Sequence, residues 1–165
     1  MGATRENRIR YRRRRQPRTS NRNRTNVDNA FVASYKGSFH LNDVTLPFDV
    51  PLPYDVEKIG DCITRVSDTT FRLDEGYYRI SCYIQYLIWR SQAFTDFIYF
   101  AVYDHDSEIY IEPGMTMIPQ WYGKSSSFTN VVIKFNIPST VSIRVPDISG
   151  LVKAIVSPRL TIQKL

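Results

Sequence analysis

The chain has 165 residues, of which 42% are apolar and 13% aromatic, and a formal net charge of +6. This length suits one folded domain with a single core, and the apolar content excludes a wholly disordered chain. No run approaches the ~20 apolar residues of a membrane-spanning helix, since the best one, Tyr83–Trp89, is short and contains Gln85, so no membrane partner is expected.

The positive charge is concentrated at the N-terminus. Residues 1–26 hold ten of the 22 basic residues but only one of the 16 acidic residues, Glu6, which gives this segment a charge of +9 and leaves −3 for the rest of the chain. Such a segment cannot bury enough apolar surface to offset the entropy lost on ordering it. We therefore predict two parts, a disordered basic arm over residues 1–28 and a folded domain over residues 29–165.

Every basic residue of the arm is an arginine, whose planar guanidinium donates paired hydrogen bonds to phosphate oxygens. Binding through phosphates weakens steeply with salt and carries little sequence preference. The predicted nucleic-acid-binding residues are Arg5, Arg8, Arg10, Arg12, Arg13, Arg14, Arg15, Arg18, Arg22 and Arg24. A solvated tail or a nuclear import signal is the alternative interpretation of the arm.

Beyond the arm, apolar and polar residues alternate with period two, which predicts β-strands. The predicted strands, in chain order, are Phe31–Leu41, Val44–Phe48, Cys62–Val66, Thr69–Leu73, Tyr78–Ile88, Asp96–Tyr103, Phe128–Ile137, Val141–Val145 and Ala154–Leu165. The clearest is Tyr78–Ile88, where Ile80 and Ile84 fall on one face and Arg79 and Tyr83 on the other. No segment has convincing helical periodicity.

Turn signals separate these runs, for example Asp74-Glu75-Gly76, Asp104–Ser107 and Pro113-Gly114. About eight short strands at such spacing predict an all-β fold, a single antiparallel jelly-roll β-sandwich. Because the edge strands of an open sandwich are association surfaces, assembly of several copies is expected.

Two stretches resemble a known family. Phe71–Ser81, a strand end followed by an acidic-Gly turn and a Tyr-led strand, and the final Arg159–Leu165 look like the tumour-necrosis-factor and complement-globular-head jelly roll. The resemblance implies a ten-stranded jelly roll that packs into trimers, with aromatic residues near the threefold axis. It also implies one candidate function, a trimeric protein-binding module.

The whole layout is similar to the coat proteins of very small, satellite-type icosahedral viruses, in which an Arg-rich arm precedes one compact jelly roll. This resemblance implies a structural capsid protein, located in the virion, that forms a 60-subunit shell built of trimers and packages a single-stranded genome. RNA is the expected genome, although phosphate contacts do not distinguish it from DNA. A non-viral nucleic-acid chaperone is a third interpretation.

Residues with catalytic or metal-binding chemistry are few. His40 and His105 lie far apart and are expected at the surface or in turns, and no phosphate loop, nucleophile elbow or zinc pattern occurs, so no enzyme, catalytic residue or metal site is predicted. Asp104–Glu108, with Glu112 nearby, leaves calcium binding open, but acidic residues are ordinary in a hairpin turn. Cys62 and Cys82 are expected to be small buried hydrophobes, and a disulfide between them stays open.

Overall fold

The computed structural model describes residues 29–41, 44–90, 97–119, 123–146 and 153–165. The predicted arm, residues 1–28 with its ten arginines, lies outside the described residues. The described chain forms two six-stranded antiparallel sheets that face each other as a sandwich, and this confirms the predicted all-β fold class. Among these residues no helix has the length and apolar character needed to span a bilayer.

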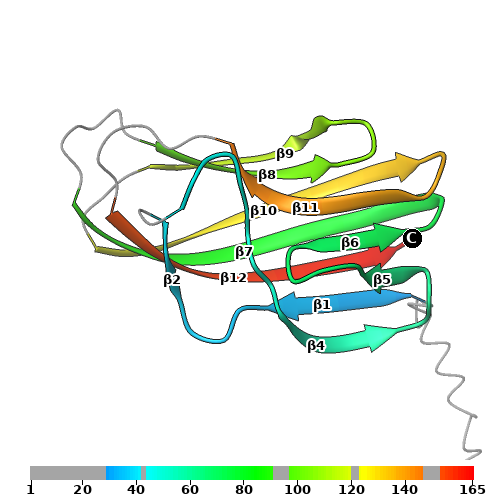
Figure 1. The fold of residues 1–165 in the computed structure, drawn as a ribbon, viewed down its shortest axis with the longest axis horizontal. Helices are drawn as coiled ribbons and strands as arrows, with labels where there is room; N and C mark the ends of the chain where they lie inside the picture. Colours follow the sequence, from blue (N-terminus) through cyan, green and yellow to red (C-terminus); the bar gives the residue numbers. More distant parts are fainter. Residues whose placement is uncertain (1–28, 42–43, 91–96, 120–122, 147–152) are drawn as a thin grey trace, which may run out of the picture.

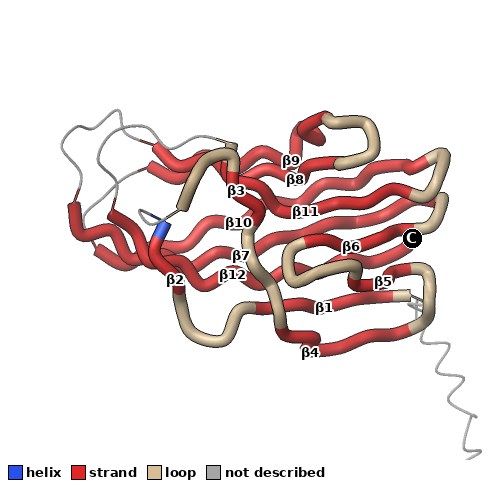
Figure 2. The backbone as a smooth tube through the Cα atoms, viewed as in Figure 1, coloured by secondary structure: helices blue, strands red, loops and turns tan. Residues whose placement is uncertain are grey.

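The first sheet has the strand order β10-β7-β12-β1-β4, and β2 pairs with β12. Its strands are β1 (Ala30–Ser34), β2 (Phe39–His40), β4 (Tyr54–Ile59), β7 (Gly76–Arg90), β10 (Gly123–Phe135) and β12 (Lys153–Lys164). The second sheet has the order β5-β6-β11-β8-β9, and β3 pairs with β11. Its strands are β3 (Phe48–Asp49), β5 (Ile63–Arg65), β6 (Thr70–Leu73), β8 (Phe97–Asp104), β9 (Ile109–Pro119) and β11 (Ser139–Val145). The long strands follow the longest dimension of the molecule (Figures 1 and 2).

Strand β7 shows how the sequence pattern builds the sandwich. Its inward side chains from Tyr78 to Ile84 are at most 2% exposed, whereas Tyr77 is 54% and Tyr83 38% exposed on the opposite face. Successive side chains of a strand point to opposite faces, so each second residue enters the core. The predicted alternation of this strand is confirmed over the residues whose side chains are described.

The core lies between the two sheets and is almost entirely apolar. Phe31 of β1 packs against Phe71 of β6 with ring centroids 5.3 Å apart, which joins the first sheet to the second. Cys82 is buried in the same layer, and this complete burial raises the pKa of its thiol to about 12. Removal of apolar surface from water is the main stabilising contribution of such a core.

The beginning and the end of the described chain lie side by side. The backbone N–H of Lys164 donates to the carbonyl of Asn29, and the N–H of Leu165 donates to the carbonyl of Tyr77. Figure 1 shows the C-terminus at the same end of the sandwich as the start of β1. The segment that precedes Asn29 therefore joins the body at an end of the first sheet.

Two predicted strands are shorter than expected. The run Phe31–Leu41 is broken, because β1 ends at Ser34 and Gly37, with φ +92°, turns the chain before β2. A positive φ is readily adopted by glycine, and it ends the extended conformation here. The run Val44–Phe48 contributes only Phe48 to β3, after a cis peptide bond between Leu46 and Pro47.

The sequence predicts about eight strands and the described residues form twelve, so several were missed. Strand β4 was missed because its alternation is short: Tyr54 and Val56 alternate with acidic residues, but Ile59 is out of phase, and all six residues are exposed. The turn predicted at Pro113-Gly114 is wrong, because these residues lie inside β9. Ile111 pairs with Val102 and Thr116 with Phe100, so the intervening residues form a bulge. A bulge accommodates a proline, which cannot donate to the ladder.

The core contact between the sheets yields a first prediction. Phe71→Ala is expected to lower the free energy of unfolding by about 3–5 kcal/mol, because the lost ring leaves a cavity beside Phe31. Phe128→Ala is the matched control: this ring is 61% exposed, so its removal is expected to cost less than about 0.5 kcal/mol. Urea denaturation measures both values, and equal losses would contradict the placement of the core.

Candidate assembly and nucleic-acid surfaces

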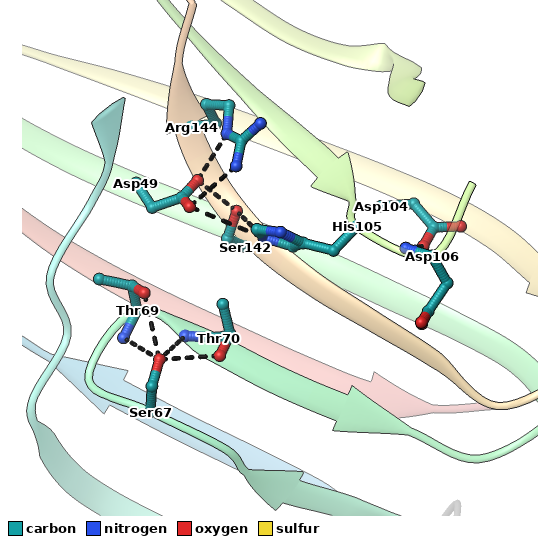
Figure 3. Close-up of polar contacts among 9 residues, drawn as sticks. All are labelled: Asp49, Ser67, Thr69, Thr70, Asp104, His105, Asp106, Ser142 and Arg144. Atoms are coloured by element: carbon teal, nitrogen blue, oxygen red, sulfur yellow. Dashed lines mark hydrogen bonds and ion pairs between the residues drawn. The ribbon is translucent and has the colours of Figure 1, made fainter. Parts of the chain in front are cut away.

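A polar cluster joins β3, β11 and the turn after β8 (Figure 3). Asp49 lies directly opposite Arg144 in the β3–β11 ladder, and the guanidinium donates two hydrogen bonds to its carboxylate, at 2.7 and 2.9 Å. The hydroxyl of Ser142 donates to the same carboxylate at 2.8 Å. His105 points toward this group, with Nε2 3.0 Å from the hydroxyl oxygen of Ser142. The Cζ atom of Arg144 lies 3.6 Å from the centroid of the Tyr103 ring.

The hydrogen bonds connect Asp49, Ser142 and His105 in a different order from that of a catalytic triad, and the cluster has a structural role. In a triad the imidazole stands between hydroxyl and carboxylate and takes the hydroxyl proton. Here the Ser142 hydroxyl donates its hydrogen bond directly to Asp49, so Nε2 of His105 serves as the donor to Ser142. Because Arg144 already neutralises the carboxylate, the cluster has no activated nucleophile.

The electrostatics of Asp49 fit this stabilising role. Burial alone would raise the pKa of its carboxyl, but hydrogen bonds from Arg144 and Ser142 favour the charged form and leave the pKa below its ordinary value of 3.8. The pKa of Arg144 is raised by the same hydrogen bond with Asp49. The pair is therefore charged at neutral pH and stabilises the β3–β11 contact.

The acidic run Asp104–Glu108, for which the sequence did not decide whether calcium binds, forms the hairpin turn between β8 and β9. The carboxylate of Asp104 accepts the N–H of Asp106 and the hydroxyl of Ser107. Asp106 accepts the N–H of Thr140, which is the main reason that its pKa is lowered, and it also pairs with Arg72 at 2.7 Å. The described residues contain no group of three side chains that could hold a metal ion. The side chain of Glu112 lies outside the described residues.

The two cysteines differ from each other. Cys82 is buried as predicted, but Cys62 is only half-buried, because the neighbouring Ile63 takes the inward position. Both are free thiols, so the disulfide that the sequence left open is absent. Nζ of Lys164 lies 3.5 Å from the Cys62 sulfur. The predicted positions of the histidines agree with the structure: His40 is exposed in β2, and His105 begins a turn.

Two surfaces of the first sheet are candidates for binding. The β4 edge is the strand Tyr54–Ile59, which pairs with β1 on one side and ends the sheet on the other. It exposes apolar side chains, with Tyr54 at 42%, Val56 at 54% and Ile59 at 41%. Unpaired strand edges with apolar side chains promote association between chains. The β4 edge is therefore the candidate surface for self-association.

The second candidate, called here the outer face, is the solvent side of β7, β10 and β12. Its described side chains are Tyr77, Arg79, Ser81, Tyr83, Gln85, Ser126, Phe128, Asn130, Val132, Lys134, Ser157, Arg159, Thr161 and Gln163. They include three cations, three aromatic rings and no acid. The alternation in the sequence placed Arg79 and Tyr83 opposite the core-facing residues of β7, but the register of β7 with β10 and β12 depends on contacts distant in sequence.

Comparison with known proteins places the fold. No family model matches the sequence, and no curated protein matches it. Among solved structures, PRD1 vertex protein P5 has a TM-score of 0.57 at 14% identity, covering 84% of this chain and 98% of its own. The globular domain of zebrafish complement 1qA protein has a TM-score of 0.56 at 10% identity, covering 81% and 94%. Murine APRIL has a TM-score of 0.55 at 12% identity, covering 83% and 98%.

These likenesses show the fold of the described chain, a jelly-roll β-sandwich like those of PRD1 vertex protein P5, the globular domain of complement 1qA and murine APRIL. The predicted similarity to the tumour-necrosis-factor and complement-head jelly roll is confirmed at the level of the fold. None of the three names denotes a catalyst. At 10–14% identity the comparison carries no residue role from those proteins to this chain.

The polar cluster yields the second prediction. Asp49→Asn is expected to lower the free energy of unfolding at neutral pH by about 1.5–3 kcal/mol, because it removes charge-assisted hydrogen bonds from Arg144. Asp61→Asn is the control, since that carboxylate is fully exposed and lies 3.8 Å from Lys58. Chemical denaturation at pH 7 measures both.

The third prediction concerns acid. A carboxyl whose folded pKa is depressed stabilises the fold above its unfolded pKa, and this stability is lost as pH falls through the folded pKa. The contribution of Asp49 is thus complete above its ordinary value of 3.8 and is lost progressively below it, as the pH falls through the lowered folded pKa. Unfolding between about pH 5 and pH 2 should therefore be less pH-dependent for Asp49→Asn than for the unmodified chain. Parallel pH profiles would contradict the assigned pKa direction.

Proposed function

We propose that this chain is a structural coat protein of a small virus. The jelly roll of residues 29–165 assembles into a closed icosahedral shell, and the Arg-rich segment of residues 1–28 packages a single-stranded genome, with RNA the expected form, inside the virion. The proposal includes trimers as building units, about 60 subunits in the shell and no catalytic activity.

The observation that carries the proposal is the separation of charge along the chain. The first 26 residues hold a charge of +9, whereas the rest, which contains the whole sandwich, has −3. A shell of about 60 copies would bring about 540 positive charges to its lumen, which suits a genome of about a thousand nucleotides. The fold agrees with this role, since PRD1 vertex protein P5 has the same architecture.

The β4 edge supports the assembly part of the proposal. A closed shell needs contacts between rigid copies, and a sheet edge that exposes Tyr54, Val56 and Ile59 offers both apolar area and backbone groups for pairing. The polar cluster and the acidic turn belong to the second sheet and stabilise the body. The described residues present no arrangement of side chains that calls for a catalytic function in addition to the proposed one.

A trimeric protein-binding module is the second candidate function, and the likeness to murine APRIL and to the complement 1qA head favours it. This candidate gives no role to ten arginines in a segment of 26 residues. It predicts a soluble trimer with a protein partner and no salt-dependent affinity for nucleic acid.

The fourth prediction tests the coat-protein proposal. The full chain is expressed with all ten arm arginines changed to Gln, and, as a matched control, with all ten changed to Lys. The Gln variant is expected to keep a folded body and to lose co-purifying nucleic acid, because the phosphate-binding charge is gone. The Lys variant is expected to retain most of it, since Lys preserves the charge without the paired hydrogen bonds.

Electron microscopy, the ratio of absorbance at 260 and 280 nm and nuclease protection measure the outcome. Closed particles with protected nucleic acid from the unmodified chain support the proposal. Nucleic acid retained by the Gln variant would contradict the role of the arm. Only small oligomers free of nucleic acid, from the unmodified chain, would favour the protein-binding module.

A further inference from the structure

The arginines of the body differ in whether they have an acidic partner. Arg65, Arg72 and Arg144 each form an ion pair with an aspartate, so their charge is locally neutralised. Arg79 of β7 and Arg159 of β12 are exposed on the outer face, and neither has an acidic partner among the described residues. These two guanidinium groups are available to an external anion.

Aromatic rings lie beside these cations. In the sheet register, Arg159 is directly opposite Tyr83, and Tyr83 is directly opposite Phe128, so the three side chains form one cross-strand row. Directly opposite residues have Cβ atoms about 5 Å apart. At the other end of the face, Nζ of Lys134 lies 5.7 Å from the ring centroid of Tyr77. The two aromatic ends are six residues apart along β7, about 20 Å.

The neutral side chains between the two ends are polar, except for Val132 opposite Arg79. Ser81 donates a hydrogen bond to the side-chain oxygen of Asn130 at 3.0 Å, and Thr161 lies opposite Ser81 on β12. The core of a protein interface is usually depleted in charged groups, whereas this face carries three cations and no acid. Packing of this face on the same face of another copy would bring like charges together.

From this combination we infer that the outer face binds single-stranded nucleic acid, as a second site that adds to the arm. Arg79, Arg159 and Lys134 would contact phosphates, and Tyr83, Phe128 and Tyr77 would stack on bases. Cationic grooves with exposed aromatic rings bind single strands with little sequence preference. The inference rests on the proposed coat-protein function and names the part of the body that meets the genome.

The position of the arm supports this site. The arm joins the body at Asn29, whose carbonyl accepts the N–H of Lys164 at the end of β12. Leu165 follows Lys164 in the chain, and its backbone N–H donates to the carbonyl of Tyr77 on the outer face. The arm therefore begins close to one end of this face. A strand gripped by the arm is thereby held near a surface of matching charge, which raises its effective concentration there.

The test uses the full chain, with the arm intact, and a fluorescent 20-nucleotide oligouridylate as probe. Affinity is measured over a range of salt, at concentrations where sedimentation shows a constant assembly state. Arg79→Gln/Arg159→Gln is expected to reduce the magnitude of the slope of log affinity against log salt by about 1.4, because each lost phosphate contact of a single strand removes about 0.7. Lys36→Gln, which removes an exposed cation outside both the outer face and the β4 edge, is expected to leave the slope unchanged.

A second pair of variants tests base stacking. Phe128→Leu keeps an apolar side chain but loses the ring, and it is expected to weaken binding about fivefold or more. Val66→Ala, which shortens an apolar side chain that is 61% exposed just after β5 on the second sheet, is the control and is expected to have no effect. All of the substituted side chains are exposed, so the variants are expected to stay folded, and a change in affinity then reports on binding.

Each outcome separates this inference from the coat-protein proposal. A steep slope that Arg79→Gln/Arg159→Gln leaves unchanged would overturn the second site and leave packaging by the arm intact. A change in sedimentation of that variant, without a change in slope, would assign the outer face to a second copy of the chain and also overturn the inference. Absence of salt-dependent binding by the unmodified chain would overturn the coat-protein proposal itself.

Discussion

The packing of two sheets onto one shared apolar layer is the constraint on which the rest of the structure depends. Since strand side chains alternate, burial of Tyr78, Ile80 and Ile84 in that layer forces Arg79 and Tyr83 to the opposite side of β7. A slip of one residue would exchange the two sets. The composition of the outer face is therefore a direct consequence of the core, and its charge and aromatic rings are fixed by the same register that buries the apolar residues.

Charge is distributed in the described body in two ways. On the second sheet and at its junctions, aspartates neutralise Arg72 and Arg144, and these pairs hold turns and short strands in place. On the outer face of the first sheet the cations remain without acids. Together with the +9 of the N-terminal segment, this arrangement concentrates the available positive charge on the arm and on one face. The β4 edge instead exposes three apolar and three charged side chains, two of them acidic.

The sequence was sufficient for what depends on local pattern. The fold class, strand β7 and the turn at Asp104–Ser107 followed from alternation and turn residues. Strand β4 was missed because an exposed edge has no buried face, and β9 because a bulge absorbs Pro113-Gly114. The Asp49–Arg144 pair joins residues 95 positions apart, and the row Arg159–Tyr83–Phe128 joins three strands, so both depend on a register that no local window contains.

The most direct test of the account is the salt dependence of the affinity of the full chain for a single-stranded oligonucleotide. If the ten arm arginines grip phosphates, the slope of log affinity against log salt should be about −7 or steeper, at about 0.7 for each neutralised phosphate. Removal of residues 1–28 should reduce the slope to about −2, the share of the three cations on the outer face, while the β-sandwich stays folded. A shallow slope for the full chain, or collapse of the sandwich without those residues, would contradict the division between a cationic arm and a self-sufficient body.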